Sequence, residues 1–308
     1  MKKIDMHFHT RLSDWSRNNN EVLKETKEKW IDFISATEHD IVNEDLVVSA
    51  RMNWISSTCW VEISAFDDIN DKSLHLTCYS DNFWLEIRDI LDWVREKRKI
   101  KIKKQIDRLE ENGFNIDYDK FLKFYKNLDV NIDNINNFHI EDYIFQKEDD
   151  LEKLLSRLIW KKLDKWEFIK ECLKKDWEFR NIWWEQIPKY EPTVSKIWDL
   201  SIQNKYFLSL AHPNFTFNND EEGFLKFIDE YQDKLNWIEI NSQANEKWVK
   251  LIIDTSVKYW MILTFWSDSH HKWRDQKHWD LWDMNKYITE ELIEENFEDF
   301  LYELSKTN

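Results

Sequence analysis

A His-x-His pair within an apolar run constrains this chain more than any other feature. The segment Asp5-Met6-His7-Phe8-His9-Thr10 is typical of a β-strand, in which successive side chains project to opposite faces. His7 and His9 therefore project to the same face, and two adjacent imidazoles are half of a tetrahedral metal site. The pair predicts a metal centre whose remaining ligands come from distant parts of the chain.

The apolar pattern predicts an α/β fold built on a parallel sheet. Seven short runs have strand character: Ile4–Phe8, Asp32–Thr37, Ile55–Ile63, Leu74–Tyr79, Phe207–Ala211, Trp237–Ile240 and Met261–Phe265. Helical periodicity precedes the second, sixth and seventh runs, at Asn20–Trp30, Gly223–Lys234 and Lys247–Tyr259. Strands that alternate with helices favour βαβ units and parallel pairing.

Residues 82–203 have a different character and predict a mainly helical insertion between the fourth and fifth strands. The segment Trp93–Glu111 is amphipathic and ends at Asn112-Gly113, a typical helix C-terminus. Segments Asp149–Trp166 and Glu167–Lys175 continue the helical pattern. We therefore expect residues 1–81 and 204–308 to form one β/α domain that carries this insertion.

Polar residues gather where the strand runs end, as expected for the carboxyl ends of barrel strands, where active sites form. The candidate metal ligands are imidazoles and carboxylates: His7, His9, Asp14, His39, Glu62, His75, His212, Asp268 and His270. Mixed nitrogen and oxygen donors suit Zn²⁺, Mn²⁺ or iron, and a central carboxylate such as Glu62 can bridge two cations. We expect His7, His9, Glu62, Asp268 and His270 to be catalytic.

The motifs resemble those of the PHP (polymerase and histidinol phosphatase) family. The matching segments share a fixed order along the chain: Asp5-x-His7-x-His9-Thr10, Ser13-Asp14, Thr37-Glu38-His39-Asp40, Val61-Glu62-Ile63-Ser64, Leu74-His75-Leu76, Ala211-His212-Pro213 and Ser267-Asp268-Ser269-His270. The resemblance implies a distorted seven-stranded β/α barrel that holds two or three divalent metal ions. Glu38 stands where the family usually has Asp, and this difference bears on the surroundings of His39.

The resemblance also implies how the ligands are shared among the metals. The first metal would take His7, His9, Glu62 and Asp268. The second would take Glu62, His75 and His212, and the third Asp14, His39 and His270.

Weaker features concern the substrate. Asn137-Phe138-His139-Ile140, Ile187-Pro188 and Ile197–Asp199 resemble the subfamily that hydrolyses nucleoside 3',5'-bisphosphates and trims short RNA from its 5' end. An Arg-Pro pair usually precedes the histidine, and Asn137-Phe138 replaces it here. His139 is a candidate substrate contact or a packed histidine. His271 and Arg274 belong to a predicted loop with Lys272 and His278. We expect this cationic loop either to contact a substrate phosphate or to be an ordinary exposed loop.

Composition limits the partners and the compartment. A net charge of -16 argues against long nucleic acid as a partner but not against a small anionic substrate that metals attract. No apolar run reaches the roughly 18 residues of a membrane span, and no secretion signal is expected. Cys59, Cys78 and Cys172 form no metal-binding or disulfide pattern, which favours the cytoplasm.

The sequence therefore predicts a metal-dependent phosphoesterase. We expect a metal-activated hydroxide to attack a phosphomonoester. A nucleotide derivative is the favoured substrate. Histidinol-phosphate phosphatase is the alternative within the same family. A non-catalytic, polymerase-associated metal-binding module is the alternative outside enzymology. Amidohydrolases also begin with His-x-His but lack the Glu62, His75 and Ser-Asp-Ser-His arrangement.

The chain holds 19 tryptophans and 2 glycines, whereas average usage gives about 7% glycine. Several tryptophans, such as Trp15, Trp30, Trp60, Trp260 and Trp266, stand at expected turns or strand edges, where glycine is common. We hypothesise that most of these positions are glycine in the native protein. UGA codons that encode glycine in some bacteria would give this sequence if they were translated as tryptophan. A genuinely tryptophan-rich protein is the alternative.

Overall fold

A computed structural model describes residues 3–14, 17–80, 85–147, 165–168, 191–267 and 284–306, with single residues 151, 173 and 281. The chain divides into two compact units, the first formed by residues 1–92 and 191–308 and the second by residues 93–190. Helix α9 (Val194–Asn204) belongs to the first unit, although its sequence falls within the predicted insertion. The domain bounds 82–203 remain a prediction.

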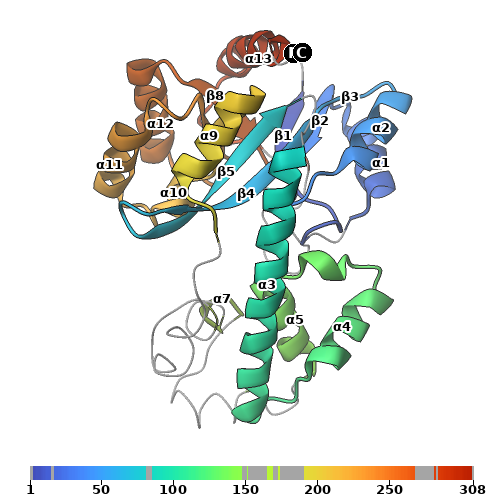
Figure 1. Ribbon diagram of the computed structural model, residues 1–308. Coiled ribbons are helices and arrows are strands. Elements are labelled where there is room, and N and C mark those ends of the chain that lie inside the picture. Colours follow the sequence, from blue (N-terminus) through green and yellow to red (C-terminus); the bar gives the residue numbers. More distant parts are fainter. Residues whose placement is uncertain are drawn as a thin grey trace. The chain divides into compact units, whose positions relative to one another are not determined.

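The first unit is mixed α/β, as expected. Its strands form two sheets (Figure 1). The elements of the three-stranded sheet, in spatial order, are β1 (Ile4–Phe8), β2 (Phe33–Ala36) and β3 (Ser56–Ser57). Those of the five-stranded sheet are β4 (Cys59–Asp67), β5 (Lys72–Ser80), β6 (Phe207–Leu210), β7 (Trp237–Asn241) and β8 (Ile262–Trp266).

Among the described residues the strand ladders form two open sheets, and not the closed seven-stranded barrel that the resemblance implies. The third predicted run, Ile55–Ile63, spans both sheets because it is divided at Thr58. The Thr58 carbonyl accepts a hydrogen bond from Ser35 of β2, and its hydroxyl donates to the Ser80 carbonyl of β5. Strand β1 also lies beside β8, so the sheets adjoin at a second place.

The expectation of parallel pairing throughout was wrong for β5, which runs antiparallel to both β4 and β6. The reason is local. Only four residues, Asp68–Asp71, separate β4 from β5, and a parallel crossover requires a dozen or more. The pairs β1–β2, β2–β3, β6–β7 and β7–β8 are parallel, as predicted.

Helices cover the two sheets of the first unit. They are α1 (Asn19–Lys29), α2 (Glu44–Met52), α9, α10 (Pro213–Thr216), α11 (Glu221–Tyr231), α12 (Glu246–Tyr259) and α13 (Glu290–Ser305). Val22 of α1 and Leu46 of α2 are buried with Ile34 of β2 in one apolar cluster. Phe227 of α11 and Ile252 of α12 share the larger core with the five-stranded sheet. The sheets are therefore covered by apolar helix faces, which leaves the strand ends for polar groups.

The second unit is helical in its described part. Helix α3 (Leu85–Glu111) enters it and is followed by Gly113, whose φ of 90° is the left-handed geometry that the sequence predicts there. The remaining elements are α4 (Tyr118–Asn127), the 3₁₀ helix η1 (Ile132–Asn134), α5 (Asn137–Lys147) and α7 (Lys165–Phe168). Phe121, Ile140 and Phe168 belong to their shared core. Most of the predicted helices Asp149–Trp166 and Glu167–Lys175 lies outside the described residues.

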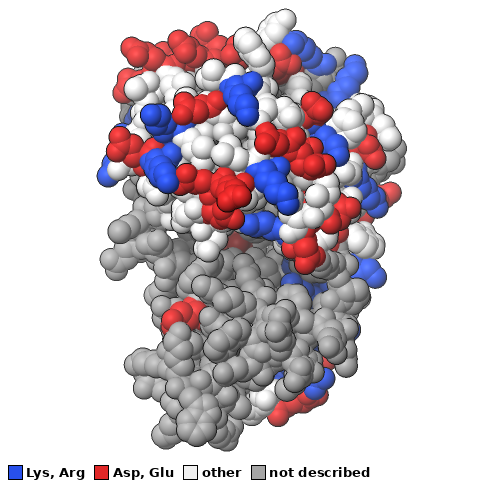
Figure 2. All heavy atoms as spheres, turned by 90° about the vertical axis from the view of Figure 1, so that its left-hand side faces the viewer, with Lys and Arg blue, Asp and Glu red and all other residues white. Residues whose placement is uncertain are grey.

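Charged side chains of both signs are interspersed over the described part of one face of the first unit (Figure 2). On α11, for example, Lys226 stands among Glu222, Asp229 and Glu230. Within the described ranges, every helix is too short or too polar to traverse a bilayer.

Three tryptophans adopt backbone conformations that favour glycine. Trp30 and Trp260 follow the last residues of α1 and α12 with φ values of 55° and 56°, and Trp54 has a φ of 62°. Their exposed fractions are 82%, 93% and 98%, so burial of the indoles does not offset the strain. These positions support the glycine hypothesis. Trp60 does not share this feature, because it is buried within β4, and Trp15 lies outside the described residues.

We expect Trp30→Gly, Trp54→Gly and Trp260→Gly each to raise the free energy of unfolding by about 1 kcal/mol, because glycine adopts a positive φ without strain. The control is Trp93→Gly, the same change at a partly exposed site inside right-handed helix α3, which should lower stability by about 1 kcal/mol. Urea unfolding measures both signs. Destabilisation by all four changes would contradict the hypothesis, as would mass-spectrometric detection of tryptophan at these positions in the native protein.

Candidate metal centre

A buried carboxylate, Glu62, stands at the centre of the site. It lies in β4 next to the carboxyl end of β2, where His39 and Glu62 form an isolated parallel bridge. Its Oε1 is 2.8 Å from Nδ1 of His75 and 2.8 Å from Nε2 of His212. Its Oε2 is 2.8 Å from Nδ1 of His39. Histidines from β5, from the end of β6 and from the loop after β2 therefore meet at one side chain.

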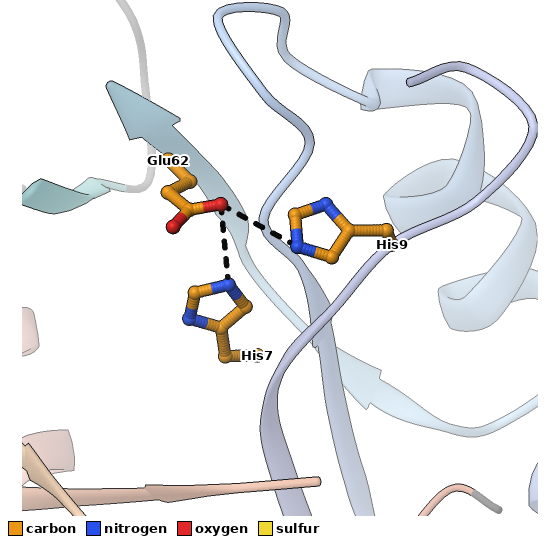
Figure 3. Close-up of side chains that lie close together, drawn as sticks. All are labelled: His7, His9 and Glu62. Atoms are coloured by element: carbon orange, nitrogen blue, oxygen red, sulfur yellow. Dashed lines mark ion pairs between the residues drawn. The ribbon is translucent and has the colours of Figure 1, made fainter. Parts of the chain in front are cut away.

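The two histidines of the N-terminal strand approach the same carboxylate. Nε2 of His7 lies 3.5 Å from Oε2 of Glu62, and Nε2 of His9 lies 3.4 Å from that atom (Figure 3). Both imidazoles point toward Glu62, as expected when alternate residues of an extended segment project to the same face. The ligand atoms of His7, His9 and Glu62 lie close enough to hold one metal ion.

Two further groups of side chains could each hold a cation. One consists of His9, Asp14 and His39, with Nε2 of His39 3.5 Å from Oδ2 of Asp14. The other consists of His39, Glu62 and His75. His9, His39 and Glu62 thus each belong to two groups. The sequence-based division of ligands among three metals remains a prediction.

Several predicted site residues cannot be placed relative to this cluster. Asp268, His270, His271 and Arg274 lie outside the described residues. The described chain reaches Ser267, whose hydroxyl donates a 2.7 Å hydrogen bond to Asp5 of β1.

His139 is buried on α5, where its Nδ1 accepts a 3.1 Å hydrogen bond from the Asn136 backbone N–H. The Tyr125 ring lies 4.9 Å from its ring, centroid to centroid. These contacts are typical of a packed histidine, the alternative that the sequence leaves open. Its contact with substrate remains a prediction.

A buried hydrogen-bond network around Glu38 holds the loop that carries Asp14. The Glu38 carboxylate accepts hydrogen bonds from the Thr10 backbone N–H, from the hydroxyls of Thr10 and Ser13, and from the Asn43 amide. The Ser13 hydroxyl also lies 3.3 Å from Nδ1 of His9. Glu38 therefore contacts His9 through Ser13, whereas the sequence motif related it to the surroundings of His39. Asn43 was not predicted.

Sequence reasoning missed Glu239, which contacts two of the predicted ligands. It lies in β7, is buried, and its Oε1 is 2.8 Å from Nδ1 of His7. Its Oε2 accepts a 2.8 Å hydrogen bond from the backbone N–H of His212. The signal was a lone carboxylate inside the apolar run Trp237–Ile240, since a buried charge requires partners.

The electrostatics of the cluster centre on an ionised Glu62. Burial alone would raise its pKa, but His39, His75 and His7 hold that pKa well below its usual range. Burial alone would lower the pKa of His7 and of His39. The charges of Glu239 and Glu62 on His7, and of Glu62 and Asp14 on His39, outweigh burial and raise each pKa to about 10. The carboxylates thus stabilise positive charge at this point.

The donor set fits divalent cations. Nitrogen and oxygen atoms from five histidines and two acidic residues converge in a buried volume, which is the chemistry that Zn²⁺, Mn²⁺ and iron favour. His7 and His9 have fully buried side chains, whereas the side chain of His75 is 33% exposed and that of His212 is 16% exposed. The side of the centre formed by His75 and His212 is therefore the one that solvent reaches.

Comparisons with known proteins support the fold. No protein-family model matches the sequence, and no curated protein matches it. A protein of Bifidobacterium adolescentis, described as a "putative metal-dependent phosphoesterase", has a similar structure with a TM-score of 0.72 at 15% identity. The match covers 98% of this chain and 96% of that one. An amidohydrolase of Chromobacterium violaceum, with bound sulfate and no metal, has a TM-score of 0.66 at 16% identity over 89% of each chain.

We expect Mn²⁺ or Zn²⁺ at a hundredfold its Kd to raise the free energy of unfolding by about 2.7 kcal/mol, because the cation binds only the assembled cluster. Glu62→Gln should abolish this gain, since it removes the charge that the groups share. The matched control is Glu28→Gln on α1, where the side chain is 64% exposed and the gain should persist. Thermal unfolding with and without a chelator measures the effect. Equal stabilisation of the Glu62→Gln variant would contradict the assignment of the site.

Proposed function

We propose that this protein is a metal-dependent hydrolase that cleaves phosphomonoesters. One observation carries the proposal: a buried carboxylate surrounded by five histidines from β1, β5 and the segments that follow β1, β2 and β6, on a fold similar to that of the Bifidobacterium adolescentis protein described above. Divalent cations supply Lewis acidity and lower the pKa of water, which phosphate-ester hydrolysis requires. The clustering of ligand groups around Glu62 supports the use of more than one cation.

The protein's own residues divide the work. His7, His9 and Glu62 would form the buried base of the site, where no side-chain surface reaches solvent. His75 and His212 would line the open side and meet the substrate first. Asp14 and His39 would hold a further cation on the side of the loop after β1. Asp268 and His270 complete the proposed ligand set.

A tetrahedral oxyanion is the favoured ligand for the open side. The amidohydrolase with a similar fold binds sulfate, which shares its geometry and charge with a phosphate group. We propose a small nucleotide-derived phosphomonoester, such as a nucleoside 3',5'-bisphosphate or a short oligoribonucleotide. His139, His271 and Arg274 are the proposed substrate contacts.

The finer assignments complete the proposal. The chain would be a PHP-family protein with a distorted seven-stranded β/α barrel, interrupted by a helical insertion over residues 82–203. Its cofactors would be two or three Mn²⁺, Zn²⁺ or iron ions. The mixed surface charge (Figure 2) supports a small substrate over long nucleic acid, and the cytoplasm is the proposed location.

Amide hydrolysis is the second candidate function, favoured by the description of one structural neighbour as an amidohydrolase. Histidinol phosphate is the alternative phosphomonoester. A non-catalytic metal-binding module is the third possibility, and the experiment below distinguishes it from both hydrolase functions.

The test is a substrate panel run with Mn²⁺, on protein that carries glycine at positions 30, 54 and 260. We expect release of inorganic phosphate from adenosine 3',5'-bisphosphate to exceed release from histidinol phosphate, with no hydrolysis of acyl-amino acids or cyclic amides. Preference for histidinol phosphate would contradict the nucleotide assignment. Amide cleavage would overturn the phosphoesterase proposal, and metal binding without any turnover would indicate the non-catalytic module.

His9→Ala and Asp268→Ala should each reduce phosphate release to the background rate, because each removes a proposed ligand. Circular dichroism should show unchanged secondary structure in both variants. The control is Lys24→Ala on the exposed side of α1, which should retain the full rate. Rates near those of the unmodified protein in either ligand variant would contradict its role.

A further inference from the structure

Glu239 meets hydrogen-bond donors at both carboxylate oxygens. Oε1 is 2.8 Å from Nδ1 of His7, which belongs to β1. Oε2 is 2.8 Å from the backbone nitrogen of His212, at the junction between β6 and α10. One buried side chain on β7 thus connects two segments that lie 205 positions apart (212 − 7) and carry predicted metal ligands.

The contact with His7 determines which ring nitrogen faces the cluster. A carboxylate accepts hydrogen bonds only, so Nδ1 of His7 must carry the proton in this contact. Nε2 then faces Glu62, 3.5 Å away, and offers its lone pair to a cation there once its own proton is released. A carboxylate on the far nitrogen of a histidine ligand fixes the ring orientation and increases its basicity.

The contact with His212 holds a backbone that would otherwise be strained. His212 has a φ of 34° and a ψ of 60°, a left-handed conformation that residues other than glycine rarely adopt. The hydrogen bond from its N–H to the Glu239 carboxyl group stabilises that conformation. In this conformation Nε2 of His212 lies 2.8 Å from Oε1 of Glu62.

We propose that Glu239 is a positioning residue that sets the His7 tautomer and holds the His212 backbone, so that both imidazoles are oriented for cation binding before a cation arrives. The inference rests on the proposed metal-dependent function. An amide cannot replace the carboxylate, because glutamine offers one acceptor oxygen and its NH₂ group would face the second N–H donor.

The test compares cation affinity in three variants. Glu239→Gln should weaken Mn²⁺ and Zn²⁺ binding by about 10- to 100-fold, the usual effect of removing the partner of a histidine ligand. Glu239→Asp keeps the charge and both acceptor oxygens, so its cation affinity should lie between those of the unmodified protein and of Glu239→Gln. The matched control is Asp67→Asn. Asp67 lies on β4 and is buried, as Glu239 is on β7. It accepts hydrogen bonds from Ile69, Asn70 and Tyr231 and not from predicted metal ligands.

Isothermal titration of metal-free protein measures affinity. Nitrogen-15 spectra of the Zn²⁺-loaded protein report the His7 tautomer. If Glu239 had only a structural role, its replacement would leave this tautomer unchanged. We expect a protonated Nδ1 on His7 in the unmodified protein and a changed Nδ1 signal in Glu239→Gln. Asp67→Asn should lose stability but keep both the affinity and the signal.

The outcomes are distinct. Wild-type affinity and an unchanged His7 signal in Glu239→Gln would overturn the inference, as would an equal loss of affinity in Asp67→Asn. If Glu239→Gln does not fold, Glu239→Asp decides: wild-type affinity with an unchanged His7 signal overturns the inference. Cation binding without phosphatase turnover would overturn the proposed function alone. Absence of cation binding in the unmodified protein would overturn both.

Discussion

The ionised carboxylate of Glu62, fully removed from water, is the interaction on which the rest of the structure depends. A buried charge is costly unless opposite charge and hydrogen-bond donors surround it. Here the donors come from β1, from the loop after β2, from β5 and from the end of β6. Only His75 comes from the neighbouring strand of a hairpin, and the other donors are distant in sequence, so the charge is fully compensated only when both sheets have assembled. The buried charge of Glu62 therefore stabilises only the strand arrangement that brings these donors around it.

The antiparallel strand β5 shows how the topology serves this requirement. A short hairpin returns the chain directly from β4, so Ser64 of β4 pairs with His75 of β5. Ser64 lies two residues after Glu62 on β4, so its partner His75 is close to Glu62. The His75 imidazole reaches Oε1 of Glu62. A parallel neighbour would instead require a crossover connection of a dozen or more residues. The departure from parallel pairing thus places a histidine at the solvent-facing side of the centre.

The sequence predicted the parts of the site that follow from local periodicity. Alternation along β1 placed His7 and His9 on one face, and the ends of the apolar runs located Glu62, His75 and His212. It did not predict that β5 is antiparallel, because the apolar runs themselves carry no direction and the short segment between the third and fourth runs was not used as a signal. It also did not divide Ile55–Ile63 at Thr58, which hydrogen-bonds to Ser35 and Ser80. Glu239 escaped notice because a single carboxylate in an apolar strand has no periodic pattern. Its partners, His7 and the backbone of His212, are distant in sequence.

His7 of β1 and His9, which directly follows that strand, each have Nδ1 supported by an acidic residue. Glu239 contacts Nδ1 of His7 directly, whereas Glu38 acts on Nδ1 of His9 through the Ser13 hydroxyl. Burial raises the pKa of both carboxyl groups; hydrogen bonds from Ser13, Thr10 and Asn43 oppose that rise at Glu38, and positive charge on His7 opposes it at Glu239. Protons on the imidazoles and divalent cations between them are alternative ways to supply that charge. Cation binding at this centre is consequently coupled to proton release, because a ligand nitrogen must be deprotonated before it can coordinate.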